Sequence, residues 1–93
     1  MPLTGSQRRA LRALGHHLDP VVQVGQAGIT EGVIGAVDQA LETHELIKVK
    51  VQPEDRREAA EELARATGSE LAQVLGRTVL LYRPRKEDPK IVV

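Results

Sequence analysis

An alternating stretch in the middle of the chain constrains the fold more than any other feature. The residues that alternate are Leu46, Ile47, Lys48, Val49, Lys50 and Val51. This period of two indicates a strand that turns its β-branched side chains to one face and its two lysines to the other. Helical patterns flank this strand on both sides. We therefore expect parallel strands joined by helices through right-handed crossovers.

The remaining segments extend this pattern to the whole chain. We expect helices over 4–15, 30–43 and 53–68, a strand over 21–24, and a hairpin of strands over 71–75 and 78–83. Thr4 and Gln7 form a capping-box pattern at the first helix, and Pro53 suits the first turn of the third. We expect Thr30 to cap the start of the second helix and Gly68 to end the third. In the first helix, Leu11 and Leu14 continue to Leu18 as one apolar stripe.

The last strand fixes the order of the sheet. Residues 79–82 are apolar on both faces, which is typical of an interior strand. The predicted fold class is therefore α/β (a two-layer α+β arrangement), α-β-α-β-α-β-β, with a four-stranded mixed sheet in the order 1-2-4-3. The second and third helices then cover one face. Lys48 and Lys50 project toward the other face, which the first helix covers in part.

Composition limits the class of protein. With 93 residues, 41% of them hydrophobic, and 13 basic against 13 acidic side chains, the chain suits one small globular domain. We assign this domain to residues 1–86, followed by a C-terminal tail over 87–93, and we expect the chain from Pro84 onward to be loose until its last apolar residues. No apolar run reaches the length of a membrane span, and we find no signal peptide. Cysteine is absent, which suits a reducing cytoplasm.

Motifs for enzyme chemistry are missing from the sequence. His44-Glu45 begins like a zinc-protease helix, but Lys48 stands where the second histidine is needed. His16 and His17 are adjacent and diverge, so they do not share a metal ion easily. There is no cysteine nucleophile and no phosphate-binding loop with its lysine. We predict no catalytic residue, no metal site and no cofactor.

A short glycine turn between a strand and a helix is the most informative local feature. Its residues are Gly25, Gln26, Ala27 and Gly28. Paired glycines allow the backbone to approach a ligand closely, and backbone N–H groups before a helix suit a phosphate. KH domains clamp a nucleic-acid backbone with this spacing. A plain tight turn explains the same residues, so both interpretations stay open here.

Longer stretches resemble a known family. The matching positions run from Leu3 to Gly25, and continue as GITEGV (28–33), ALETHELIKVK (40–50) and VLGRTVLLYRP (74–84). Together they resemble the CRM domain (chloroplast RNA splicing and ribosome maturation), and most closely the stand-alone bacterial YhbY-like RNA-binding proteins. The resemblance covers about residues 3–86, nearly the whole chain.

The resemblance implies a fold similar to the C-terminal domain of bacterial translation initiation factor 3. It also implies binding to ribosomal RNA in precursors of the large ribosomal subunit. The family's RNA-binding positions map onto Gly25, Gln26, Ala27, Gly28, Arg8, Arg9, Arg12, Lys48 and Lys50. Many members carry lysine where this chain has Gln26, and Glu31 adds a negative charge beside the turn. Both differences would weaken the grip of the turn on phosphate.

The residues also limit the binding mode. Tyr82 is the only aromatic residue, and we expect it in the core, so bases have no stacking platform. We expect phosphate and ribose contacts to structured RNA, with the arginines of the first helix flanking the glycine turn. Two alternatives remain: a module that docks on a ribosomal protein, and a binder of small anions or nucleotides. In each case we expect a monomer.

Overall fold

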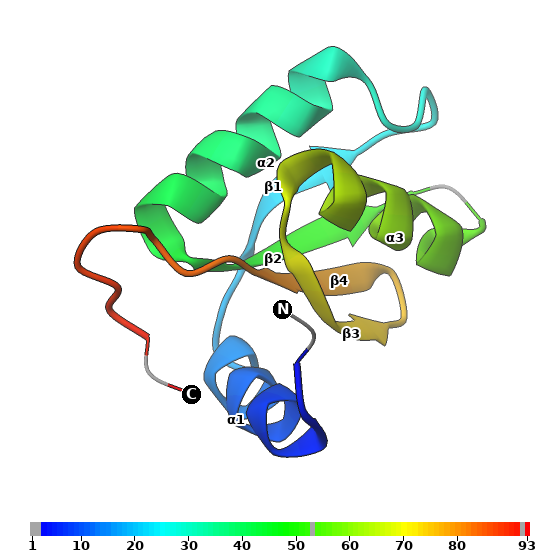
Figure 1. Cartoon of the computed structure of the whole chain (residues 1–93). Helices are drawn as coiled ribbons and strands as arrows, with labels where there is room; N and C mark the ends of the chain where they lie inside the picture. The colour runs from blue at the N-terminus through cyan, green and yellow to red at the C-terminus, as the bar shows by residue number, and fades with distance from the viewer. Residues whose placement is uncertain (1–2, 53, 92) are drawn as a thin grey trace.

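The computed structural model describes residues 3–52, 54–91 and 93 (Figure 1). Its elements are α1 (Gly5–Gly15), β1 (Pro20–Val24), α2 (Glu31–His44), β2 (Leu46–Val51), α3 (Arg56–Thr67), β3 (Glu70–Leu75) and β4 (Thr78–Tyr82). The sheet has the order β1-β2-β4-β3, with β1 parallel to β2 and β4 antiparallel to both of its neighbours. The fold class and strand order predicted from the sequence are therefore confirmed.

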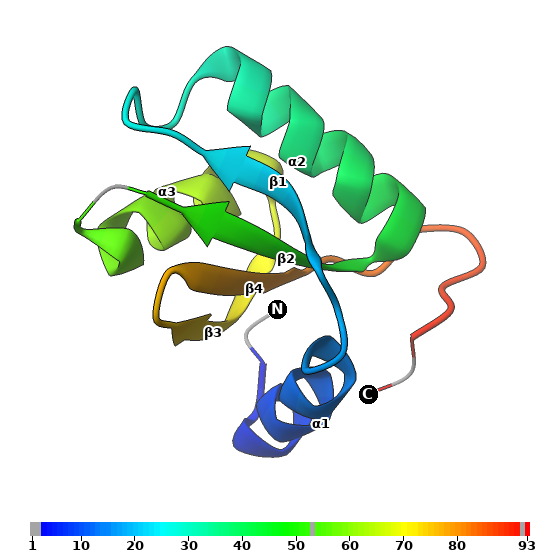
Figure 2. The ribbon, with the colours of Figure 1, turned by 180° about the vertical axis from the view of Figure 1, so that it is seen from behind.

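The sheet separates two apolar clusters. α2 and α3 pack on one face, where Val37, Leu41 and Leu63 meet the inward residues of the central strands. α1 packs on the opposite face, as Figures 1 and 2 show from two sides. There the buried cluster consists of Leu11, Leu46, Ala72, Leu80 and Tyr82. The burial of Tyr82 confirms its predicted place in the core.

Helix ends follow the local sequence. Thr4 and Gln7 form the predicted capping box: the Gln7 N–H donates to Thr4 Oγ1 at 3.1 Å, and the Thr4 N–H donates to Gln7 Oε1 at 2.9 Å. Thr30 caps α2 by accepting from the Val33 N–H at 3.2 Å. Gly68 ends α3 in the left-handed conformation, with φ of 64°. These ends are local effects, so the sequence predicts them well.

Two predictions in the helices are wrong in detail. α3 begins at Arg56, with Asp55 as its N-cap, because the Asp55 carboxylate accepts the Glu58 N–H at 3.1 Å. Pro53, the predicted start of this helix, lies outside the described residues. Leu14 is 50% exposed instead of buried.

The close contact of α1 with the sheet explains the exposure of Leu14. Gly15 is buried, and a Cβ atom there would lie 2.6 Å from Leu80 Cδ1. The face of α1 that meets the sheet therefore contains Leu11 and Gly15, four residues apart, and Leu14 lies beside it. Because a glycine does not contribute to an apolar pattern, the pattern predicts burial of Leu14 and misses the burial of Gly15.

Candidate nucleic-acid interface

The two lysines of β2 lie on the same face of the sheet as α1. Lys48 is half-buried and lines a groove of about 290 Å³ together with Arg12 and His16. Lys50, two residues further along the strand, is exposed. As expected from the alternation in the sequence, α1 covers only the part of this face nearest Leu46.

The uncovered part of the face is a row of residues that crosses all four strands. Lys50 pairs with Gln23 of β1 on one side and with Thr78 of β4 on the other, and Thr78 pairs with Leu75 of β3. We call these four residues the open row. Lys50, Gln23 and Leu75 are exposed, Thr78 is half-buried, and none of the four is acidic. A polyanion crossing this row would meet no carboxylate belonging to it.

The helices on the two sides of the sheet differ in charge: α1 is basic, α2 is acidic, and α3, on the same side as α2, carries three arginines and three glutamates. α1 contains Arg8, Arg9 and Arg12 and no acidic residue. Its three arginines are exposed, and no ion pair engages them within the described part of the chain. α2 contains Glu31, Asp38 and Glu42 and neither lysine nor arginine. The side of the molecule with α1 is therefore the one suited to phosphate.

The glycine turn is closed by one hydrogen bond and is open to solvent. The Gly28 N–H donates to the Gly25 carbonyl at 3.0 Å, and Gly28 has φ of +79°. A Cβ atom added at Gly25 or Gly28 would have no heavy atom within 4 Å. Gln26 and Ala27 are exposed. Nothing in the described chain therefore blocks the approach of a ligand to this backbone.

The structure does not bring the arginines of α1 to the glycine turn. α1 precedes β1 and the turn follows it, so the two lie at opposite ends of that strand (Figures 1 and 2). Pro20 and Val24, the ends of β1, are about 13 Å apart along an extended strand. The expectation that guanidinium groups flank the turn is corrected: the β2 lysines and the open row lie between them. Arg8 lies further away, in a groove that Arg65 lines together with Glu61 and Glu70.

An arginine in the loop between β3 and β4, Arg77, lies at the same end of the sheet as the glycine turn. Its Nη1 donates to the Gln52 carbonyl at 3.4 Å, and its own carbonyl accepts the Val51 N–H at 2.7 Å. The Gln52 N–H donates to the carbonyl of Val24, the residue before the glycine turn, at 2.9 Å. From the sequence, Arg77 is expected only as a residue of the turn between the strands over 71–75 and 78–83. The predicted strand order could have revealed the position of Arg77, because it places the start of β4 beside the end of β2.

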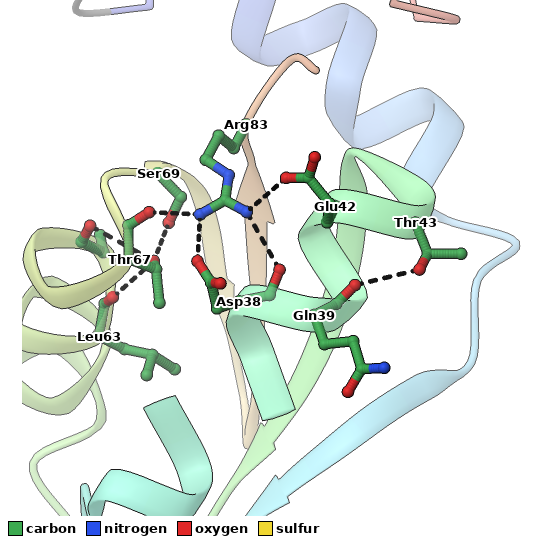
Figure 3. Close-up of polar contacts among 9 residues, drawn as sticks. Asp38, Gln39, Glu42, Thr43, Leu63, Thr67, Ser69 and Arg83 are labelled. Atoms are coloured by element: carbon green, nitrogen blue, oxygen red, sulfur yellow. Dashed lines mark hydrogen bonds and ion pairs between the residues drawn. The ribbon is translucent and has the colours of Figure 1, made fainter. Parts of the chain in front are cut away.

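Arg83 is also basic, but it is occupied by contacts within the protein (Figure 3). Its Nη1 donates to Asp38 Oδ1 at 2.6 Å and to the Thr67 carbonyl at 2.7 Å. Its Nη2 donates to the Asp38 carbonyl at 3.0 Å and to Glu42 Oε2 at 3.3 Å. Its side chain is 20% exposed. Arg83 therefore joins the end of β4 to α2 and α3 and is not part of the basic surface.

The C-terminal segment is held by a buried carboxylate. Glu45 is 1% exposed, and its side chain accepts the backbone N–H groups of Arg85, Lys90 and Ile91 at 2.9, 2.6 and 3.1 Å. Burial alone would raise the pKa of Glu45, but these three donors and the charge of Arg85 bring its pKa below the ordinary value. Arg85 and Lys90 are therefore held in place within the stretch expected to be loose, whereas Ile91 is one of the apolar residues at which the looseness is expected to end.

Other features of the surface do not suit a polyanion. A cleft of about 770 Å³ near the C-terminal segment is lined in part by Asp38, Glu42 and Glu70. An apolar groove of about 410 Å³ lies where Leu14, Leu18 and Val21 meet.

Over the described residues, no group of three or more histidines or carboxylates is placed to hold a metal ion. No helix in the same part of the chain has the length and apolar character needed to cross a membrane.

Comparison with known proteins identifies the family. The sequence matches the CRS1 / YhbY (CRM) domain over residues 3–83, so the chain belongs to the CRM family. It is 44% identical over 92 residues to "Probable RNA-binding protein YqeI" of Bacillus subtilis, covering 96% of each chain. It is 41% identical over 93 residues to "Probable RNA-binding protein PA4753" of Pseudomonas aeruginosa, covering 97% of this chain and 89% of that protein.

A solved structure has the same fold. The solution structure of the hypothetical protein SAV1595 from Staphylococcus aureus is 47% identical to this chain, with a TM-score of 0.86. The similarity covers 98% of both chains. The family resemblance drawn from the sequence is therefore confirmed, and both relatives bear the name "Probable RNA-binding protein".

Proposed function

We propose that this protein binds ribosomal RNA in precursors of the large ribosomal subunit and assists ribosome assembly. In this role it acts as a cytoplasmic monomer and as a binding protein without catalytic activity. The names of its relatives support RNA as the partner. The ribosomal target rests on the resemblance to the YhbY-like members of the family.

The observation that carries the proposal is the exposed positive charge on the α1 side of the sheet. α1, with three arginines and no acidic residue, covers the face that also exposes Lys50, whereas on the other face α2 is acidic and α3 balances three arginines with three glutamates. Guanidinium and ammonium groups on one face suit the phosphates of a folded RNA. Tyr82, the one aromatic side chain, is buried. Recognition therefore depends on the shape and backbone of the RNA.

Replacing Arg8, Arg9 and Arg12 together by alanine tests this proposal. The variant should fold, because all three side chains are exposed. It should lose co-sedimentation with large-subunit precursors at moderate salt. The dependence of log K on log salt should become shallower by about 2, from about 0.7 for each lost phosphate contact. Arg57→Ala, an exposed arginine of α3, is the matched control and should bind like the wild type.

The same experiment separates RNA binding from docking on a ribosomal protein. If the triple variant keeps its co-sedimentation and its salt dependence, the arginines do not contact RNA, and the protein-docking alternative is favoured. Binding of purified ribosomal RNA that does not change between low and moderate salt would contradict a phosphate-based mode. Calorimetry with a mononucleotide should show no binding heat, and a clear heat would favour the small-anion alternative.

A further inference from the structure

We propose that Arg77 contacts RNA and forms, with Lys50, a second phosphate-binding cluster at the glycine-turn end of the sheet. The RNA backbone then crosses the open row between this cluster and the arginines of α1. The inference rests on the proposed function and adds to it a residue and a path for the bound strand. Nothing in the family resemblance assigns Arg77 to the site.

The position of Arg77 is fixed by the hairpin. Gly76 has φ of +57°, which a two-residue turn between β3 and β4 requires, and the Arg77 carbonyl accepts the Val51 N–H at 2.7 Å. The guanidinium group donates to the Gln52 carbonyl at 3.4 Å, the limit of a hydrogen bond. A guanidinium group has five N–H donors, so most of them are left for a ligand.

The charge of Arg77 is not neutralised by the protein. Arg77 is exposed, and no carboxylate pairs with it among the residues that the structure describes. Arg83 shows the contrast, since two acidic side chains and two carbonyls occupy its guanidinium group. A free, oriented guanidinium group at the surface suits bidentate contact with a phosphate.

Lys50 continues this cluster onto the sheet. It pairs with Thr78, the residue next to Arg77, and therefore lies one strand away on the open row. Lys48 lies two residues before Lys50, about 7 Å along the strand, and shares its groove with Arg12. Cationic groups thus follow β2 from α1 to the glycine turn without an acidic residue in the open row.

The length of this path defines the class of ligand. From Lys48 to Gln52, beside Arg77, the strand extends about 13 Å. A single phosphate cannot reach both ends, whereas a nucleic-acid backbone carries phosphates along its length. The site therefore takes a polynucleotide strand. The open, unblocked backbone at Gly25 and Gly28 lies where such a strand would leave the sheet.

The test measures the affinity of the full chain for a transcript of large-subunit ribosomal RNA over a range of salt concentrations. Arg77→Ala and Lys50→Ala should each weaken binding several-fold at low salt. Each should also make the dependence of log K on log salt shallower by about 0.7. Arg77→Lys, which keeps a cation, should bind more tightly than Arg77→Ala. Arg57→Ala, an exposed arginine in the first turn of α3, should match the wild type.

A combined variant tests the two-cluster arrangement. Because Arg12 and Arg77 lie at opposite ends of the path, the losses in binding free energy of Arg12→Ala and Arg77→Ala should add in the double variant. If Arg77→Ala and Lys50→Ala bind like the wild type while the triple α1 variant does not, the second cluster is refuted and the proposed function stands. If the wild-type chain does not bind the transcript, the proposed function itself is refuted.

Discussion

Two regions of this molecule use charged side chains in opposite ways. Where α2, α3 and the C-terminal segment meet, Arg83 and Glu45 are buried or nearly so, and each makes three or more hydrogen bonds within the protein. On the side of α1, the arginines and Lys50 are exposed, and no ion pair holds the arginines within the described ranges. The first region uses charge for stability, and the second keeps charge available for a ligand.

The difference shows that residue type alone does not identify a binding site. Arg83 and Arg77 are six positions apart, and both are arginines of the same hairpin region. Arg83 meets two carboxylates, whereas Arg77 meets one backbone carbonyl at 3.4 Å. Substitutions in the first region should therefore change the free energy of unfolding, and substitutions in the second should change RNA affinity.

We expect the largest effect on stability from Glu45→Ala. The substitution leaves the N–H groups of Arg85, Lys90 and Ile91 without their acceptor and removes the attachment of the C-terminal segment. The free energy of unfolding should fall by about 2–4 kcal/mol, measured by urea denaturation. Glu87→Ala, an exposed carboxylate of the same segment, should change it by less than about 0.5 kcal/mol. Equal stability of the two variants would contradict the role of Glu45.

The same carboxylate predicts a dependence on pH. Since the pKa of Glu45 is lower in the folded chain than in the unfolded chain, its contribution to stability is complete above the unfolded pKa. That contribution is lost as the pH falls through the folded pKa. Wild-type stability should therefore fall more steeply between neutral pH and strongly acidic pH than that of Glu45→Gln. Parallel curves for the two proteins would show that Glu45 does not act through its charge.

A somewhat smaller effect is expected from Arg83→Ala. It leaves Asp38 and the Thr67 carbonyl without their donors, and hydrogen bonds of this charged kind contribute about 1.5–3 kcal/mol. We expect a loss of about 2 kcal/mol in thermal or urea unfolding, with unchanged RNA affinity of the folded protein. Arg83→Lys should recover only part of the loss, because lysine cannot span both acceptors. A loss of RNA affinity at full stability would place Arg83 in the interface instead.

The smallest effects on stability are expected in the glycine turn, and there the two glycines form a matched pair. Gly28→Ala places a side chain at φ of +79° and should cost about 1–2 kcal/mol. Gly25→Ala meets open space and should leave stability nearly unchanged. If RNA approaches the turn closely, Gly25→Ala should still weaken binding several-fold in a titration. Unchanged affinity would exclude the turn from the interface.

Much of the fold follows from local sequence signals. The alternation of β2, the apolar residues of β4 and the caps at Thr4, Thr30 and Gly68 are confirmed by the structure. These features depend on neighbours within a few positions, so a single sequence contains them. The expected face of the two β2 lysines follows from the same alternation.

The features that sequence reasoning missed depend on distant contacts. Glu45 reaches Arg85 across 40 positions, and Arg83 reaches Asp38 across 45. Glu45 also adopts φ of 65°, which no residue-type preference predicts for a glutamate. The packing of α1 on the sheet brings Gly15 close to Leu80 of β4. None of these contacts has a local signature.

The attachment of the C-terminal segment to Glu45 has a consequence for shortened forms of this protein. The family match ends at residue 83, so a truncation placed there would follow the usual homology boundary. Such a cut would remove every N–H donor from a carboxylate that lies in the interior, together with Ile91, which packs against the Leu11 cluster. We therefore expect a chain cut after residue 83 to be less stable than one that extends to Ile91.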